Sequence, residues 1–421
     1  MAFAYSGVWR SGSDPYYLWG NADWNNFQAK WSTLNQQNLR LTDIETYKQG
    51  NNTRLWSGVW RGGSDGHYLW VNADWNAFVA KWQQLAAQNL RLTTLRSYME
   101  GNARLWAGVW RQGTDGYYLW GNSDWNNFKA KWDQLSGQGL RLVDIETYTA
   151  GSTQLWAGAW RAGNDGHYLW VNADWNNFRA KWQELAAQGL RLTRMKQYMI
   201  GNQWRYAGVW RQGTDGYYLW VNASWESFIA KWQELAAQNL RLIHMHVDWI
   251  GTVPTVRMHV KILTAPTVSV DTMVTRMREV YESVGIQLQV ASTENLSLPT
   301  LNDVDVGACT SSSLTTEQSQ LFANRNNIGT NEVCAYFVRS TVPPFNGCAT
   351  YPSGRPGAVI AQGATQWTLA HEMGHVLGLS HVNDNDRLMT GNGTGNITNP
   401  PPDLIASEVQ TMRDSAFTID L

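Results

Sequence analysis

The sequence has few cysteines, almost no net charge and no long apolar segment. Its three cysteines, Cys309, Cys334 and Cys348, are too few for a disulfide scaffold and include no Cys-x-x-Cys pair. A formal net charge of −1 over 421 residues gives no indication of a nucleic-acid partner, and we expect none. Because no apolar run is long enough to cross a bilayer, we expect no membrane span. Residues 1–5 contain neither a basic start nor an apolar core, so no secretory signal peptide is visible.

Tryptophan, by contrast, is abundant and unevenly placed. Of the 26 tryptophans, 25 precede residue 250, which indicates a repeated module. Aligned against itself, the chain repeats with a period of about fifty residues, and five copies are present. The motifs Trp-Arg, Leu-Trp and Ala-Lys-Trp mark each copy, and their tryptophans are Trp9, Trp60, Trp110, Trp160 and Trp210; Trp19, Trp70, Trp120, Trp170 and Trp220; and Trp31, Trp82, Trp132, Trp182 and Trp232.

Each copy is predicted to form a strand, a turn, a strand, a helix and a strand, as the third copy illustrates. Residues 107–120 form two short strands around Asp115-Gly116, which is a hairpin signal. Asp124 is a good N-cap for a helix that runs to about residue 138, and the apolar residues of this helix share one face. Residues 140–148 alternate as a strand.

The aromatic side chains of the repeats allow two interpretations. Tryptophans on the helix face can fill the small core of a fifty-residue unit, and we favour this structural role for them. The aromatic pairs that follow the turns could instead stack on sugar rings. For these pairs both interpretations stay open: Tyr16-Tyr17, His67-Tyr68, Tyr117-Tyr118, His167-Tyr168 and Tyr217-Tyr218.

The repeats resemble the bacterial tandem repeats that also form the N-terminal half of fungal polyglycine hydrolases. The blocks Gly-Val-Trp-Arg, Tyr-Tyr-Leu-Trp and Asp-Trp-Asn-Asn-Phe carry this resemblance, which covers about residues 5–250. In that family a serine hydrolase domain of β-lactamase type accompanies the repeats. The resemblance therefore implies an accessory module of secreted hydrolases, without their catalytic chemistry. Because separate short units would leave open sheet edges, we expect the five copies to close into a ring.

A different pattern of strands and helices begins after residue 251. It predicts a strand at 256–263, a helix from residue 269 to 284 and further strands, before a helical stretch that carries histidines. The predicted fold class is therefore α+β, with five tandem repeats of about fifty residues over 1–251 and a second domain over 252–421.

The second domain contains one segment with the spacing of a catalytic metal site: His371-Glu372-x-x-His375-x-x-Gly378-x-x-His381. Residues four apart share a face of a helix, so His371 and His375 can bind the same zinc at about 2.0–2.1 Å. Gly378 allows a sharp turn that brings His381 to this metal. Three imidazoles leave one zinc position for water, and Glu372 is placed to take a proton from that zinc-bound water.

This extended motif is typical of metzincins, and residues 253–421 resemble that family, most closely its matrixin-like members. The resemblance implies a zinc endopeptidase whose Met-turn, here around Met389, forms an apolar floor beneath the metal without binding it. It also implies a sheet edge strand that pairs with the substrate backbone. We assign this role to residues 357–362, with Val359, Ile360 and Ala361 at the centre. The alternative for this segment is an ordinary buried strand.

The cysteines predict one disulfide. Cys309 and Cys348 each lie beside a glycine in loop-like sequence, whereas Cys334 lies inside an apolar strand. We therefore expect a Cys309–Cys348 disulfide in an exported protein, with Cys334 free.

Two further groups of residues have weak metal-binding patterns. Asp384 and Asp386 lie among asparagines and would suit calcium, but carboxylates at turns are usually turn formers, so a calcium site is unsupported. His244 and His246 alternate along a strand, and a polar strand face explains them better than a metal site.

These patterns together predict a zinc-dependent endopeptidase that acts on protein or peptide substrates. The repeats would recognise the substrate or a surface, and their target could be a glycan or a protein. The alternative is a lectin-like or adhesion protein with a vestigial or tightly regulated protease domain. We expect a secreted, extracellular protein exported without a visible signal peptide, and a cytoplasmic location stays open.

Overall fold

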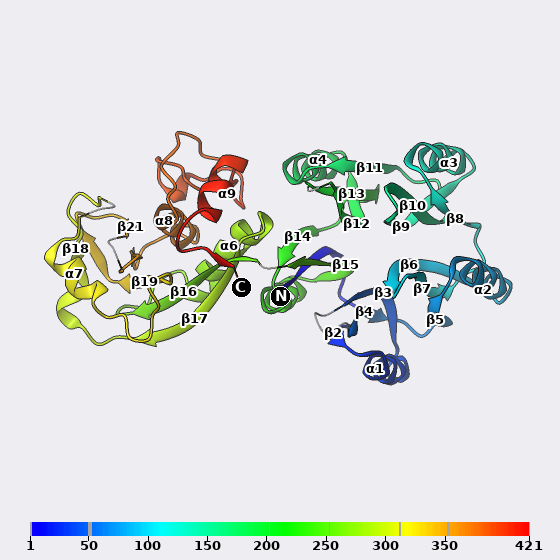
Figure 1. Cartoon of the computed structure of the whole chain (residues 1–421), viewed down its shortest axis with the longest axis horizontal. Helices are drawn as coiled ribbons and strands as arrows, with labels where there is room; N and C mark the ends of the chain where they lie inside the picture. Colours follow the sequence, from blue (N-terminus) through cyan, green and yellow to red (C-terminus); the bar gives the residue numbers. More distant parts are fainter. Residues whose placement is uncertain are drawn as a thin grey trace. The chain divides into compact units, whose positions relative to one another are not determined.

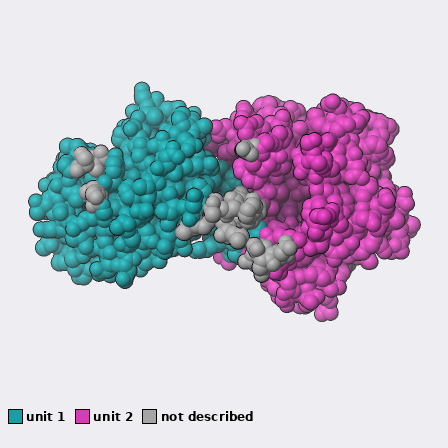
Figure 2. All heavy atoms as spheres, in the orientation of Figure 1, with its two compact units in different colours: residues 1–4, 220–231, 250–421 teal, residues 5–219, 232–249 magenta. Residues whose placement is uncertain are grey.

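The computed structural model describes residues 2–48, 53–201, 203–251, 253–310, 313–351 and 354–420. The chain divides into two compact units (Figure 2). The repeat unit comprises Tyr5–Leu219 and Trp232–Trp249, and the C-terminal unit comprises Met1–Ala4, Trp220–Lys231 and Ile250–Leu421. The domain boundary at residue 251 stays a prediction. None of the described helices is long and apolar enough to cross a membrane.

The repeats form three-stranded sheets, each of which combines strands of two consecutive copies (Figure 1). The middle strand of each sheet is the first strand of the next copy. The sheet orders are β2-β4-β3, β5-β7-β6, β8-β10-β9, β11-β13-β12 and β14-β1-β15. The bounds are β1 Ala2–Ser11, β2 Tyr16–Ala22, β3 Leu39–Lys48, β4 Arg54–Gly62, β5 His67–Ala73, β6 Leu90–Glu100, β7 Ala103–Gln112, β8 Tyr117–Ser123, β9 Leu140–Ala150, β10 Thr153–Ala162, β11 His167–Ala173, β12 Leu190–Ile200, β13 Gln203–Gln212, β14 Tyr217–Ala223 and β15 Leu240–Gly251.

The same exchange of strands closes the array, because β1 lies between β14 and β15. The arginine of each Trp-Arg motif binds the turn aspartate of the preceding copy through two guanidinium nitrogens, as Arg61 binds Asp14. Arg10 of the first copy binds Asp215 of the fifth in the same way. The recurring Arg and Asp therefore join neighbouring copies, and the Arg10–Asp215 pair joins the two ends of the array.

A helix lies between the second and third strands of each copy: α1 Trp24–Gln36, α2 Trp75–Ala87, α3 Trp125–Gly137, α4 Trp175–Ala187 and α5 Trp225–Ala237. In α3 the side chain of Asp124 accepts a hydrogen bond from the Asn127 backbone N–H, which confirms the expected N-cap. After the helix, Gly139 has a φ of +74°, a left-handed conformation that glycine adopts without strain.

The tryptophans of the helices pack against the core, as the predicted structural role requires, but they are less buried than those of the strands. The strand tryptophan Trp110 is fully buried in its sheet's core, together with Phe78 of the adjacent helix. The helix tryptophans Trp75 and Trp82 are only partly buried and pack at the margin of this core. The phenylalanine of the helix is therefore part of the core, and the tryptophans of the helix pack around the edge of that core.

The third strands of the copies carry a buried ionic network. Arg96, which is 1% exposed, pairs with Asp43, Glu45 and Asp144 at 2.6–2.8 Å. Burial opposes ionisation of Asp43, but Arg96 and a neighbouring histidine lower the pKa of this carboxyl to about 2. Lys196 pairs with Glu45 as well. Since these side chains come from four different copies, the network ties the copies to one another.

His244 belongs to this network and not to a metal site. Its Nδ1 lies 2.9 Å from Asp43 Oδ2, and its Nε2 lies 2.6 Å from the Met195 carbonyl oxygen. Burial lowers the pKa of His244. The interpretation of His244 as part of a polar strand face therefore agrees with its contacts, although the face is fully buried.

The C-terminal unit is built on a mixed sheet of order β17-β16-β19-β22-β21 (Figure 1). The strands β17, β16, β19 and β22 run parallel to one another, and β21 runs antiparallel to β22. The bounds are β16 Pro254–Ile262, β17 Gln287–Asn295, β18 Asp303–Asp305, β19 Val333–Val338, β20 Ser340–Val342, β21 Gly347–Thr350, β22 Gly357–Ala361 and β23 Ile419–Asp420. The helices are α6 Val270–Ser283, α7 Thr316–Phe322, α8 Thr368–Val376 and α9 Ala406–Arg413, with 3-10 turns η1 Pro299–Leu301 and η2 Thr394–Asn396.

The prediction that Val359, Ile360 and Ala361 form the sheet edge is wrong. These residues lie in β22, which pairs with β19 on one side and with β21 on the other. All three are buried, as the alternative interpretation of an ordinary buried strand requires. The edge beyond β22 is the four-residue strand β21, which is too short to show a periodic pattern in the sequence.

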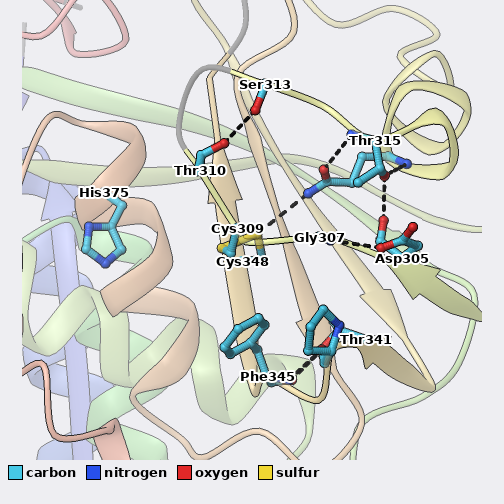
Figure 3. The surroundings of a disulfide bond; sticks show 12 residues. Asp305, Gly307, Cys309, Thr310, Ser313, Thr315, Thr341, Phe345, Cys348 and His375 are labelled. Carbon is cyan, nitrogen blue, oxygen red and sulfur yellow. Dashed lines mark hydrogen bonds between the residues drawn. A yellow bond between two sulfur atoms is a disulfide. The ribbon is translucent and has the colours of Figure 1, made fainter.

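Cys309 and Cys348 form a disulfide, and Cys334 is a buried free cysteine (Figure 3). The bridge joins the loop after β18 to the edge strand β21. It closes a loop with a sequence separation of 39 residues. In the chain-entropy model, such a loop stabilises the fold by about 3–4 kcal/mol.

The buried network generates a first prediction. Arg96→Met leaves Asp43, Glu45 and Asp144 without their shared partner, so the free energy of unfolding of the repeats should fall by about 3–5 kcal/mol. Tryptophan fluorescence during denaturation measures this, because 25 of the 26 tryptophans precede residue 250. Lys129→Ala is the control, since its ion pair with Asp133 is exposed and should contribute at most about 0.5 kcal/mol. Equal unfolding curves for the two variants would contradict the role of Arg96.

Candidate metal centre

Helix α8 and the turn after it bring three histidines together. His371 and His375 lie one helical turn apart on α8. The helix ends at Val376, and Gly378 adopts a φ of +100°, which turns the chain back so that His381 faces the helix. The Nε2 atom of His371 lies 3.1 Å from that of His381 and 3.2 Å from that of His375, and the third Nε2–Nε2 distance is 2.9 Å.

The backbone fixes the rings in the orientation that a metal requires. The Nδ1 atom of His371 lies 2.7 Å from the Leu388 carbonyl oxygen, and that of His375 lies 2.8 Å from the Leu379 carbonyl oxygen. An Nδ1–H that donates to a carbonyl leaves the Nε2 lone pair directed at the common centre. Burial lowers the pKa of His371 to about 4 and lowers that of His375 as well, so both rings are neutral at pH 7.

This donor set fits a single zinc ion. Nitrogen ligands around a tetrahedral zinc lie roughly 3.3 Å apart, close to the 2.9–3.2 Å between these Nε2 atoms. Three imidazoles also leave the fourth zinc position open. Among the residues that the structure describes, this is the one group of three or more potential ligands that converges in this way.

Met389 packs against α8, and its role as an apolar floor beneath the metal stays a prediction. It is fully buried. Its sulfur would lie 2.6 Å from a Cβ added to Gly374, so only glycine at this helix position leaves room for it. The backbone next to Met389 supports the histidines directly, because the Leu388 carbonyl is the partner of His371.

Glu372 of α8 is buried, and its side chain packs against the edge strand β21. Its side chain is close to the backbone of Gly347. Burial raises the pKa of Glu372 to about 8, and the backbone N–H of Ala349 acts in the opposite direction. A buried carboxylate beside three convergent imidazoles has the position and the environment of a general base.

The structure adds residues to this site that sequence reasoning missed. The Tyr281 hydroxyl of α6 donates a buried hydrogen bond of 2.8 Å to the Ala370 carbonyl of α8. Gly347 and Ala349 of β21 contact Glu372. These contacts join segments far apart in the chain, and a motif within one segment cannot reveal them.

Asp384 and Asp386, considered above for calcium, form a turn. The Asp384 carboxylate accepts a hydrogen bond from the Asp386 backbone N–H at 3.0 Å. The Asp386 carboxylate accepts one from the Thr398 hydroxyl. Both carboxylates thus stabilise loop structure, and a calcium site remains unsupported.

Two known families match parts of this chain. The family described as polyglycine hydrolase-like, structural repeat, matches residues 13–61, 69–113, 116–162 and 169–213. The metallo-peptidase family M12B, reprolysin-like, matches residues 249–401. Among solved structures, the crystal structure of archaemetzincin from Methanopyrus kandleri is similar at 12% sequence identity, covering 38% of this chain and 94% of that chain with a TM-score of 0.25. No curated protein sequence matches the chain.

The metal centre generates a second prediction. Elemental analysis of the purified protein should find one zinc per chain, and His375→Ala should lose it because two imidazoles bind zinc far more weakly than three. The control is His67→Gln, which changes a half-buried histidine of the repeats and should keep the zinc. Stoichiometric zinc in His375→Ala would contradict the assignment of the three ligands.

Proposed function

We propose that Glu372 is the general base of this zinc metallopeptidase, whose reprolysin-like domain follows polyglycine hydrolase-like repeats, and that the repeats select its targets. The observation that carries the catalytic part is the position of Glu372. Its carboxylate is buried, and it is adjacent in the helix to His371, one of three histidines whose Nε2 atoms converge.

In the proposed reaction, Glu372 transfers one proton from the attacking water to the leaving amine. A zinc ion held by His371, His375 and His381 supplies Lewis acidity towards a peptide carbonyl and a water molecule. Glu372 accepts a proton from the attacking water. The same carboxyl then donates this proton to the nitrogen of the leaving amine. Burial of Glu372 supports this role, because a carboxyl with a raised pKa can both accept and return a proton near neutral pH.

We propose β21 in place of β22 as the strand that pairs with an extended substrate. The Ala361 N–H donates to the Asn346 carbonyl, which makes this opposed pair a hydrogen-bonded one. Hydrogen-bonded and non-bonded pairs alternate in an antiparallel ladder, so the backbone groups of Gly347 and Ala349 point away from β22. The outward groups of Gly347 and the Ala349 carbonyl are available to a substrate backbone, whereas the Ala349 N–H faces Glu372.

For the repeats, a cavity of about 510 Å³ supports a role in target recognition. It lies between α3 and β11 and is lined by the aromatic rings of Trp125, Trp156, Trp170 and Tyr198, together with the polar groups of Lys129, Gln154 and Asn172. Aromatic faces with polar groups at their margin are the chemistry that sugar rings require. We therefore propose a glycan-bearing protein as the target, which the peptidase then cleaves.

The first test concerns the base. Glu372→Gln keeps the size of the side chain but cannot accept the proton, so hydrolysis of unfolded casein should fall by about 10²–10⁴-fold while the zinc content stays the same. The control is Glu294→Gln on β17, whose carboxylate is half exposed. A chelator should abolish the casein hydrolysis of the wild-type protein.

Two outcomes would contradict this proposal. Full activity in Glu372→Gln would exclude Glu372 as the base. Absence of hydrolysis by the zinc-loaded wild-type protein would instead favour the alternative, an adhesion protein with a vestigial protease domain.

The second test concerns the cavity of the repeats. Trp170→Ala should raise KM for a glycosylated protein substrate by about tenfold and leave KM for unglycosylated casein unchanged, because a central aromatic contact contributes about 1–2 kcal/mol to binding. Trp19→Ala is the matched control, since Trp19 occupies the same position in the first copy and does not line this cavity. Enzymatic deglycosylation of the substrate should remove the difference. Equal KM values for all three proteins would contradict glycan recognition by this cavity.

A further inference from the structure

The edge strand β21 leaves a space for the catalytic carboxylate that a single methyl group would fill. A Cβ built on Gly347 would lie 2.5 Å from Glu372 Cγ, 2.6 Å from Oε1 and 2.7 Å from Cδ. Contacts shorter than 3.0 Å do not occur for a real Cβ, so one of the two groups would have to move. The contact includes the Cγ atom near the base of the Glu372 side chain, so turning the carboxylate alone does not relieve it.

The backbone of Gly347 does not itself require glycine. The φ angle of Gly347 is not in the left-handed region. Ten other glycines of the described chain have a positive φ, and Gly347 is not one of them. Gly347 is the first residue of β21, and glycine loses more conformational entropy on folding than alanine and packs no side chain. Space for Glu372 is therefore the structural reason for glycine at this position.

Two residues further along the same strand, Ala349 presents its backbone N–H to the carboxylate. This N–H points away from β22, and it favours the ionised form of Glu372. Ala349 packs in the apolar core that contains Ala370 and Met373 of α8. Gly347 and Ala349 thus face Glu372 from the same strand, the first by leaving room for its side chain and the second by presenting its backbone N–H.

The disulfide anchors this strand between the two contacts. Cys348 is fully buried and bonded to Cys309, and the Gln318 amide of α7 lies 3.6 Å from its sulfur. It packs in a different core from Ala349, together with Val359 and Phe322, as the alternation of side chains along a strand requires. Figure 3 shows this bridge on the strand beside α8, the helix that carries His375.

We propose that β21 is a positioning strand for the catalytic base: Gly347 provides the space for the Glu372 side chain, the Ala349 N–H orients its carboxylate, and the Cys309–Cys348 disulfide holds the strand in place. This inference rests on the proposed function of Glu372. Neither Gly347 nor Ala349 takes part in the chemistry through a side chain.

The main test is Gly347→Ala in the full chain, with Gly363→Ala as the matched control. A Cβ at Gly363 would meet no atom within 4 Å, and this glycine lies in the turn before α8. We expect kcat for a short peptide to fall on the order of 10²-fold in Gly347→Ala, because small displacements of a catalytic group have effects of this size. KM and zinc content should change less than twofold, and Gly363→Ala should resemble the wild type.

A double-variant cycle tests whether the effect of Gly347→Ala acts through Glu372. Alanine at position 372 lacks the Cγ, Cδ and Oε1 atoms that a methyl group at position 347 would meet. Gly347→Ala should therefore lower the free energy of unfolding less in the Glu372→Ala background than in the wild-type background. Strictly additive effects of the two substitutions on the free energy of unfolding would show that the two positions do not interact and would overturn the inference.

A measurement on metal-free protein tests the role of the Ala349 N–H without relying on activity or on Gly347→Ala. The amide of Ala349 should exchange its hydrogen at least tenfold faster in Glu372→Ala than in the wild type, because an outward N–H at a sheet edge loses its acceptor. The amide of Cys348, which faces β22, is the internal reference and should exchange at the same rate in both proteins. Equal rates for Ala349 would overturn the inference.

The two levels of the proposal fail in different ways. Full activity of Glu372→Gln removes the proposed base and the inference with it. An inactive Glu372→Gln combined with a wild-type kcat in Gly347→Ala leaves the proposed function intact and removes only the positioning role of β21.

Discussion

The metal centre depends on holding three imidazoles with their Nε2 atoms 2.9–3.2 Å apart. Nitrogen lone pairs at this separation repel one another, so the surrounding backbone must fix each ring before a cation can bind. The carbonyls of Leu388 and Leu379 do this for His371 and His375. The helix that carries both rings is held in turn by the hydrogen bond from Tyr281 of α6. The chemistry of the site therefore depends on contacts from three separate parts of the C-terminal unit.

The repeats are subject to a different constraint, because no copy forms its three-stranded sheet from its own strands alone. Each sheet takes its middle strand from the next copy, and β1 completes the fifth. Residues that perform this joining recur in every copy, as the Trp-Arg motif does. The residues of the third strands differ between neighbouring copies instead. Equal charges on neighbouring copies would repel one another in a buried network, whereas the observed Asp43, Glu45, Arg96, Asp144 and Lys196 attract.

The last repeat also contributes to the C-terminal unit, which includes residues 220–231. Lys231 of α5 is fully buried and pairs with Glu279 of α6 at 2.7 Å, and the Ser227 hydroxyl donates to Glu282 of the same helix. Burial raises the pKa of Glu282 to about 8. Since α6 also carries Tyr281, the helix that supports α8 is itself supported by α5. Residues 220–231 thus belong to the packing that supports α8 within the C-terminal unit.

The sequence by itself determined the features that depend on local spacing. Residues four apart on a helix share a face, so His371, Glu372 and His375 could be placed together from the motif, and self-similarity revealed the five copies. Only the tertiary structure decided the order of the strands. A segment such as 357–361 has the same apolar composition at an edge as in the middle of a sheet, and the neighbour that makes it internal, β21, is four residues long. The contact of Gly347 with Glu372 was likewise invisible, since it joins an isolated glycine to a residue 25 positions later. Strand pairing and close packing are non-local, and their partners are chosen by the whole fold and not by the pattern of any one segment.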